Sequence, residues 1–295
     1  MRLEDLAQGG SLPLAAIGGD KALAREMQVR LAAIGLLDLP ADGQFGPVSH
    51  WALSAFCSRA GLTLGVMIGP SVAEALLSPA SDKLFAIKPA ASLAGRVVAA
   101  MTRLGYSVCR HPDAVNIAYV EGLDTDGSAN DNRPNVFNDV RLVLRIAIDG
   151  TPELAGIWEG TSEPGRHYTE VELLDPRGAA RIALGQFKAW SVGTHNGSEP
   201  HEALVQTWEI KVHRDLNKDY LRLNDVVDNG LFGINQHWGY NHERGDIRKA
   251  SAGCMVGRTK TGHREFMALC KSDPRYMASR AYRFMTTVLP AGELA

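Results

Sequence analysis

Helical periodicity is concentrated in the first third of this 295-residue chain. In the segment from Lys21, apolar residues recur at helical spacing at Leu23, Met27, Leu31 and Ile34. Long helices do not alternate with the strand-like segments that follow, which favours an α+β fold over a doubly wound α/β sheet. We therefore expect a small helical domain followed by a β-rich domain. The strand-like segments are short and are broken by Gly, Pro and polar clusters: 115–121, 140–148, 154–160, 180–190 and 204–212.

The N-terminal segment predicts three helices. The first ends at Gly35, the turn Ala41-Asp-Gly-Gln-Phe-Gly-Pro47 follows, and the second carries Trp51, Ala52, Ala55 and Phe56 on one side. The third runs from Ser71, a suitable N-cap, to Leu77. Over residues 18–78 this arrangement resembles the small three-helix peptidoglycan-binding domain attached to many wall hydrolases. A generic helical bundle, which would use the same turn residues, is the alternative.

The boundary between the two domains is expected after this helical segment. Residues 79–112 read as a linker rich in Ser, Pro and Ala, followed by a helix over 91–104 that Gly105 terminates. Residues 113–295 then form the β-rich domain, which contains one more helix from His263 onwards. The polar loop over 122–134 lacks the ordered ligand spacing of an EF-hand and is expected to be a solvent loop.

The chemistry most readily inferred from the sequence is that of a cysteine nucleophile. Cys254 follows Gly253, and His237 precedes it by seventeen positions. Histidine has a pKa suited to removing the thiol proton at neutral pH. Small residues at Ser251 and Gly253 leave room for a substrate carbonyl and leave backbone N–H groups free to hold an oxyanion. The alternative is a buried cysteine in a glycine-rich turn.

The pattern of His237, Gly245 and Ser251-Ala-Gly-Cys254 resembles the catalytic signature of the L,D-transpeptidase family (YkuD type). This resemblance implies a β-rich catalytic domain with an acyl-cysteine mechanism on peptidoglycan stem peptides. It makes Cys254 the nucleophile, His237 the general base, and Ser251 and Gly253 the flanking small positions.

The chain departs from the family pattern at two positions, which marks it as a divergent branch. Ala252 replaces a second histidine, and Val256 stands where Arg or Asn commonly follows the cysteine. Arg248 or Arg258 is the candidate to bind the substrate carboxylate instead, because arginine binds carboxylates in bidentate fashion.

Residues near His237 have further candidate roles. Trp238 and Tyr240 are candidates to line the substrate groove, although aromatic residues beside a turn are as often packing residues. Asp246 is a candidate to orient the His237 ring, and a backbone carbonyl could do the same. The resemblance implies no metal or other cofactor.

The expected function is a peptidoglycan-cleaving cysteine enzyme of the L,D-endopeptidase or carboxypeptidase type. An L,D-transpeptidase that forms crosslinks or exchanges D-amino acids is an alternative, because the acceptor that reaches the acyl-enzyme decides the outcome. A zinc-dependent wall amidase or peptidase and a non-catalytic wall-binding protein are further alternatives. The zinc hypothesis rests on five histidines without a compact ligand motif: His195, His201, His213, His237 and His242.

The composition of the chain limits which binding partners and which place of action are expected. The net charge is −2 and no long basic run occurs, so nucleic acid is not an expected partner. No apolar run reaches the roughly 18 residues of a membrane span, and four cysteines without close pairing do not suggest a disulfide framework. The N-terminus shows no signal peptide. Cytoplasmic synthesis followed by action in the periplasm or cell wall is expected, as an endolysin released through a holin or an effector delivered by secretion machinery.

Overall fold

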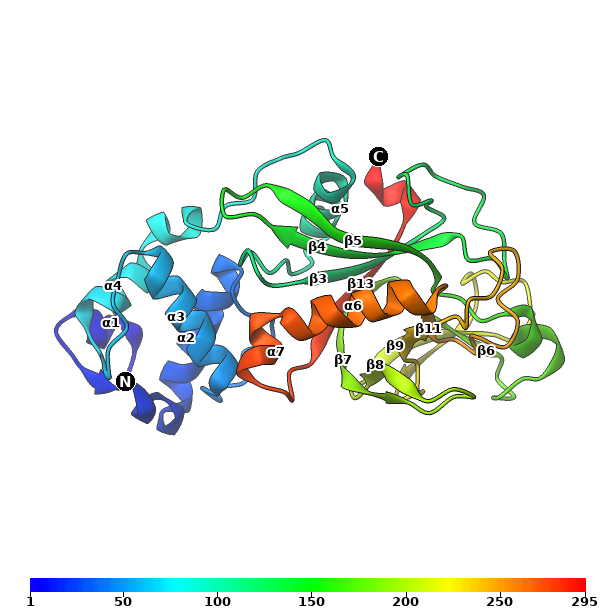
Figure 1. Cartoon of the computed structure of the whole chain (residues 1–295). Coiled ribbons are helices and arrows are strands. Elements are labelled where there is room, and N and C mark those ends of the chain that lie inside the picture. The colour runs from blue at the N-terminus through cyan, green and yellow to red at the C-terminus, as the bar shows by residue number, and fades with distance from the viewer.

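The computed structural model describes all 295 residues, and it consists of a helical N-terminal unit and a β-rich domain (Figure 1). The α+β organisation expected from the sequence is confirmed. Segments 1–85 and 113–295 each have their own hydrophobic core, and helix α5 (Leu93–Arg103) covers one face of the β-rich domain.

The helical unit contains four helices and a two-stranded sheet: α1 (Leu3–Ala7), α2 (Lys21–Ile34), α3 (Pro47–Arg59), α4 (Pro70–Leu77), β1 (Leu12–Pro13) and β2 (Met67–Ile68). Helix α2 begins where Asp20 accepts hydrogen bonds from two backbone N–H groups, and it ends at Gly35, whose φ is 87°. The three helices predicted over 21–77 are present. The core also includes Leu3, Leu6 and Ile17, so the unit begins earlier than residue 18.

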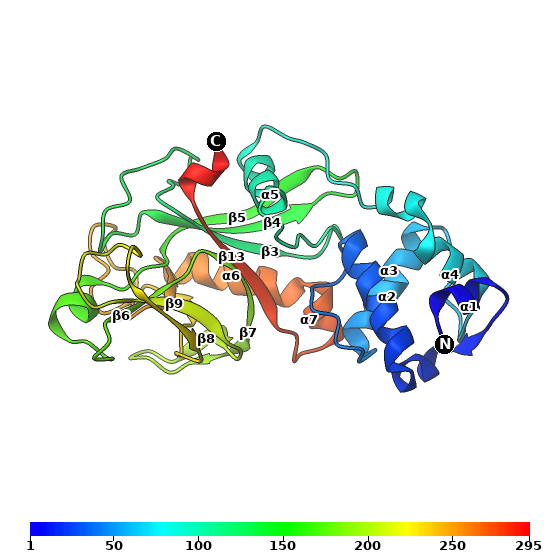
Figure 2. The ribbon, with the colours of Figure 1, turned by 180° about the vertical axis from the view of Figure 1, so that it is seen from behind.

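Eight strands of the β-rich domain close into a barrel in the order β11-β12-β5-β4-β3-β13-β7-β8. The C-terminal strand β13 lies between β3, with which it runs parallel, and β7 (Figure 2). The strands are β3 (Asn116–Glu121), β4 (Asp139–Ile146), β5 (Pro152–Thr161), β7 (Gly185–His195), β8 (His201–Gln206), β11 (Gln236–Trp238), β12 (Met255–Gly257) and β13 (Phe284–Pro290).

The domain also contains a second sheet, two α-helices and two single-turn helices at His167–Val171 and Ala291–Leu294. The sheet has the order β10-β9-β6 and consists of β6 (Ala179–Ile182), β9 (Ile210–Asp215) and β10 (Val226–Gly230). Helix α6 (Lys260–Ser272) buries Phe266, Met267 and Cys270 against the barrel, and α7 (Pro274–Ala278) follows it. Cys270 is therefore a core residue.

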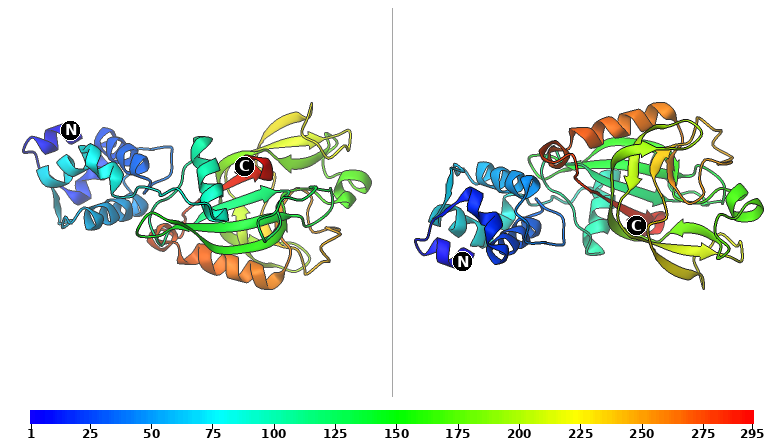
Figure 3. Two further views of the ribbon diagram at one scale, coloured as in Figure 1. Left: turned by 90° about the horizontal axis from the view of Figure 1, so that it is seen from above. Right: turned by 90° about the horizontal axis from the view of Figure 1, so that it is seen from below.

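The helical unit packs against the end of the β-rich domain where α7 lies (Figure 3). Asp38 accepts a hydrogen bond from the Arg275 guanidinium at 3.1 Å and another from the Tyr282 hydroxyl at 2.5 Å. The Asp38 side chain is only 5% exposed, so a buried ion pair joins the two parts. None of the helices combines the length and apolar character required to cross a bilayer.

Candidate active site

Cys254 ends a tight turn that leads into strand β12. The Ser251 hydroxyl donates to the Cys254 carbonyl at 2.8 Å and accepts from the Gly253 N–H at 3.1 Å. Gly253 has a φ of 130°, and a Cβ at this position would lie 2.4 Å from the Ala180 carbonyl oxygen. Only glycine fits there, because other residues would clash and would rarely adopt that φ. The small residues at 251 and 253 thus shape the turn that presents the thiol.

His237 lies on β11, which pairs in parallel with β12. His237 is opposite Val256, and Cys254 lies two residues before Val256. Cys254 lies just before β12, and it lines the same cavity as His237. The structure therefore brings together the two residues on which the predicted chemistry depends.

The tautomer of His237 follows from its one hydrogen bond. Nδ1 lies 2.8 Å from the Trp238 carbonyl oxygen, which accepts and cannot donate, so Nδ1 carries the hydrogen. Nε2 is left as the basic nitrogen. The ring is 1% exposed, and burial together with neighbouring His195 places the pKa of His237 well below its usual value.

The Cys254 thiol is hydrogen-bonded to backbone groups in this structure. Sγ accepts from the Asn235 N–H at 3.4 Å and donates to the Gly233 carbonyl at 3.6 Å, and no hydrogen bond joins it to His237. Burial raises the pKa of the thiol to about 11, although the Asn235 N–H opposes this shift. The Cys254 side chain is thus a neutral thiol at neutral pH. Catalytic hydrogen bonds are often absent without substrate and form in the complex.

Two cavities meet at Cys254. One has a volume of about 550 Å³ and includes Arg177, Arg214 and Phe232 in its lining. The other has a volume of about 490 Å³, and its lining includes His237 and Tyr240. Both cavities are also lined by Cys254, Tyr168 and Ala252. The sulfur can therefore be approached from two sides.

The turn offers one free oxyanion donor. The Gly253 N–H is bonded to the Ser251 hydroxyl, so it is not free to bind an oxyanion as expected from the sequence. The Cys254 N–H has no acceptor among the protein groups. Of the two N–H groups of this turn, only that of Cys254 is therefore available to an external acceptor such as an oxyanion.

Neither arginine predicted to bind a carboxylate lines the cavities beside Cys254. Arg258 forms an ion pair with Glu159, and Arg248 is exposed and lies 3.6 Å from Asp246. Their charges are satisfied locally, so the expectation that they replace the missing family side chain is not supported. The arginines that do line a cavity are Arg177 and Arg214, which the sequence did not single out.

The aromatic candidates differ in position. Tyr240 lines the 490 Å³ cavity, as expected for a groove residue. Trp238 lines neither cavity and stacks on His201 with ring centroids 3.7 Å apart, so it is a packing residue. Asp246 accepts a hydrogen bond from Asn135 and has no contact with His237, whose ring is oriented by a backbone carbonyl instead.

His195 and Asn235 are site residues that the sequence did not identify as partners. The His195 ring stacks on His237, and its Nδ1 lies 3.0 Å from the Asn235 side-chain nitrogen, which donates to it. Asn235 also contacts Cys254 through its backbone N–H. His195 and Asn235 are 40 positions apart, and no local pattern relates them. Only the closure of the barrel brings these residues together.

The histidines predicted as alternative zinc ligands are not arranged as a ligand set. No group of three His, Cys, Asp or Glu side chains has a geometry that could hold a metal ion. Both ring nitrogens of His201 are engaged, Nδ1 with the Glu199 carbonyl at 2.7 Å and Nε2 with the Trp238 N–H at 3.3 Å. His213 lies on β9 in the second sheet, away from the cluster of His195, His201 and His237.

Comparisons with known proteins give limited information. No protein-family model and no curated protein sequence matches the chain. The solved L,D-transpeptidase from Xylanimonas cellulosilytica DSM 15894 is 16% identical over 90% of this chain and 92% of that chain, with a TM-score of 0.26. A fused Zn-dependent amidase/peptidase/peptidoglycan-binding domain-containing protein from Clostridium acetobutylicum ATCC 824 is 12% identical over 95% and 99% of the two chains, with a TM-score of 0.28. These scores are too low to support an argument about activity, which must come from the site itself.

Proposed function

We propose that the protein is a peptidoglycan-cleaving cysteine enzyme that acts on stem peptides through an acyl-Cys254 intermediate. The observation that carries the proposal is that Cys254 and His237 line the same cavity, with the basic Nε2 of His237 unprotonated. The resemblance of the residue pattern around these two positions to that of L,D-transpeptidases supplies the substrate class. The motif of the helical unit, which resembles a peptidoglycan-binding domain, suggests the same polymer.

In the proposed mechanism, His237 Nε2 takes the proton from the Cys254 thiol as Sγ attacks a stem-peptide carbonyl. The Cys254 N–H stabilises the oxyanion. The C–N bond then breaks, and His237 returns the proton to the leaving amine. A thioester remains on Cys254. Water attacks this thioester with His237 as base, which gives a carboxylic acid and restores the thiol.

The two cavities at Cys254 suit this sequence of steps. One can hold the acyl part of the substrate while the other holds the leaving amine and later admits the second nucleophile. If an amine takes the place of water, the product is a new peptide bond or an exchanged D-amino acid. We propose hydrolysis, rather than transfer to an amine, as the main reaction. The protein would then act in the periplasm or cell wall, as an endolysin or as a delivered effector.

Digestion of muropeptides followed by mass spectrometry tests the proposal. We expect wild type to release cleaved stem peptides, with Cys254→Ala inactive and His237→Ala reduced by at least about 100-fold. Cys57→Ala, which removes a buried thiol of the helical unit, is the matched control and should retain activity. Adding D-amino acids to the same digestion reveals by mass spectrometry whether the enzyme also exchanges D-amino acids.

Other outcomes would identify another function. Cleavage that survives Cys254→Ala and stops with a chelator would indicate a zinc enzyme. Binding of peptidoglycan without any cleavage by wild type would indicate a wall-binding protein. Either result would overturn the acyl-cysteine mechanism.

A further inference from the structure

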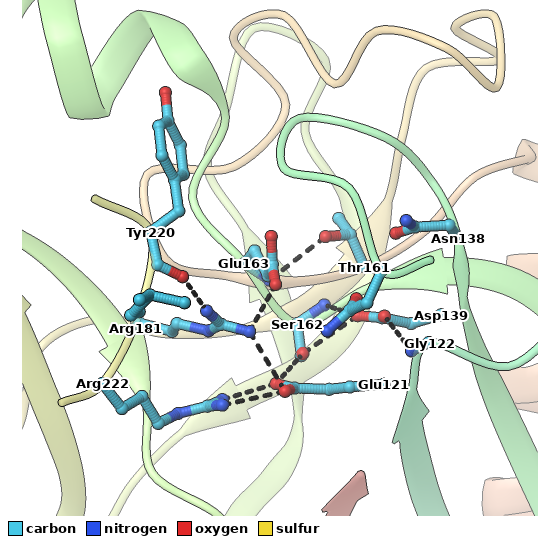
Figure 4. A network of polar contacts seen from close by, with 12 residues as sticks. Glu121, Gly122, Asn138, Asp139, Thr161, Ser162, Glu163, Arg181, Tyr220 and Arg222 are labelled. Carbon is cyan, nitrogen blue, oxygen red and sulfur yellow. Dashed lines mark hydrogen bonds and ion pairs between the residues drawn. The ribbon is translucent and has the colours of Figure 1, made fainter. Parts of the chain in front are cut away.

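A cluster of buried charged side chains lies in the β-rich domain, outside the site at Cys254 (Figure 4). Its carboxyl groups come from three segments: Glu121 on β3, Asp139 on β4 and Glu163 just after β5. Arg181 on β6 forms ion pairs with Glu163 and, at 3.1 Å, with Glu121. Glu121 also forms a bidentate ion pair with Arg222. The three carboxyl residues are at most 3% exposed.

The charges of this cluster do not balance when all its groups are ionised. Three carboxylates against two guanidinium groups leave one negative charge in excess. An uncompensated buried charge is costly, and a carboxyl group relieves the cost by keeping a proton. Glu163 is the candidate to keep it, because its Oε2 is buried and has no hydrogen-bond partner.

The pKa values of the three carboxyl groups agree with the excess of one negative charge. Burial, reinforced by Asp139 and Glu121 and opposed by Arg181, raises the pKa of Glu163 to about 8. Burial and the charge of Glu121 raise the pKa of Asp139 to about 7. For Glu121, burial is outweighed by the hydrogen bonds and charge of Arg222, which lower the pKa to about 2. Asp139 and Glu163 therefore both gain or lose a proton near neutral pH, and their titrations are linked by their charges.

Two short segments connect the cluster to the nucleophile. Gly165, two residues after Glu163, donates its N–H to the Ser251 carbonyl at 2.8 Å. Ala180 precedes Arg181, and its carbonyl oxygen occupies the space where a side chain on Gly253 would lie. The turn from Ser251 to Cys254 is thus in contact with two segments whose neighbouring residues, Glu163 and Arg181, belong to the cluster.

We propose that Glu163 is a positioning residue whose protonated carboxyl holds the Ser251–Cys254 turn in place, so that its ionisation loosens the turn. When Glu163 ionises, its carboxylate is repelled by those of Asp139 and Glu121. The resulting displacement of Glu163 is passed along the chain to Gly165, which is hydrogen-bonded to the turn. The other groups that face the cluster are the Ser162 hydroxyl, the Tyr220 carbonyl, and His213 and Asp225 near the arginines. The effect on catalysis rests on the proposed function, whereas the effect on the turn does not.

Glu163→Gln tests the proposal, because the amide has the same shape and leaves two carboxylates against two arginines. Hydrogen–deuterium exchange of 161–165 and 251–254 is compared with wild type at equal pH from 6 to 9. At pH 9, one unit above the pKa of Glu163, ionised carboxyl outnumbers neutral by about ten to one. We expect up to about tenfold faster exchange in wild type than in the variant at pH 9, and equal exchange at pH 6.

The thermal midpoint and muropeptide cleavage give independent readouts. The thermal midpoint of wild type should fall relative to that of Glu163→Gln between about pH 5 and 8, because the folded protein keeps the Glu163 proton that the unfolded chain has already released. Cleavage by wild type should fall relative to the variant between pH 7 and 9, as Glu163 ionises in the folded state, and Glu172→Gln, an exposed control, should behave as wild type. If Glu163→Gln does not fold, Asp139→Asn removes the same excess charge and should give the same result. Identical pH dependence of exchange in wild type and variant would overturn the proposal. Absence of cleavage by wild type would count against the enzyme alone, because exchange and melting still test the turn.

Discussion

The imidazole of His195 lies face to face with that of His237, with ring centroids 3.9 Å apart and planes 7° from parallel. Burial and the charge of His201 lower the pKa of His195 to about 4, so the stacked ring is neutral at neutral pH. The Asn235 side chain donates to its Nδ1, and the Asn235 N–H donates to the Cys254 sulfur. Asn235 therefore connects the Cys254 thiol to the ring that stacks on His237.

We expect His195→Ala to lower kcat about tenfold with little change in KM, because the His237 ring loses its stacking partner and a misplaced base slows proton transfer. His195→Phe keeps a ring face but no nitrogen, so it should retain part of the activity. Steady-state kinetics on a purified muropeptide measures both effects. His242→Ala is the control, since it lines the same cavity without contacting His237. Unchanged kcat in His195→Ala would contradict a positioning role.

The protonation state of the Cys254 thiol predicts how its alkylation depends on pH. Because the pKa of Cys254 is raised to about 11, only about one thiol in ten thousand is ionised at pH 7. Alkylation by iodoacetamide should therefore be slow at pH 7 and increase with pH beyond 9. Cys254 is the only cysteine that is partly exposed, so native alkylation reports on it.

His237→Ala should leave this alkylation profile nearly unchanged, because no hydrogen bond joins the ring to the resting thiol. A profile with its midpoint below pH 8 in wild type, lost in His237→Ala, would show instead a preformed thiolate–imidazolium pair. That result would require the two side chains to be in contact before substrate binds.

The sequence predicted elements whose signals are local. The apolar spacing, Asp20 and Gly35 define α2, and the β-branched segments define β3 and β4. The closure of the barrel was not predictable in this way, since β13 inserts between β3 and β7 from the far end of the chain. The parallel pairing of β11 with β12, which puts His237 beside Cys254, is a similar long-range feature.

The same distinction applies to the site. The local pattern around Cys254 identified the turn and the candidate base. Arg248 and Arg258 could not be assessed from sequence, because Glu159, which neutralises Arg258, is 99 positions away. Nothing in the sequence shows that Glu163 is buried beside Asp139. Buried charge depends on which strands become neighbours.

Gly253→Ala should destabilise the protein. The added Cβ would lie 2.4 Å from the Ala180 carbonyl oxygen, at a φ of 130° that alanine rarely adopts. We expect a loss of roughly 1–3 kcal/mol in the free energy of unfolding, measured with urea, together with loss of cleavage. Gly245→Ala is a matched control, because nothing lies within 4 Å of the added atom. Equal stability of the two variants would show that the turn can move without cost.

Asp38→Ala should loosen the junction between the helical unit and the β-rich domain. Asp38 is buried against Arg275, Tyr282 and Lys188, all from the β-rich domain, and its removal leaves the buried Arg275 with Asp273 as its only carboxylate partner. Breaking a buried ion pair costs roughly 3 kcal/mol.

We therefore expect Asp38→Ala to lower the urea midpoint and to increase the radius of gyration in small-angle X-ray scattering, as the helical unit leaves its docked position. Asp149→Ala, which removes an exposed partner of Lys88 near the same junction, should change neither quantity appreciably. Unchanged scattering in Asp38→Ala would mean that apolar contacts alone hold the unit. Cleavage of small muropeptides should survive in Asp38→Ala while cleavage of intact wall decreases, because only the polymer can engage both parts at once.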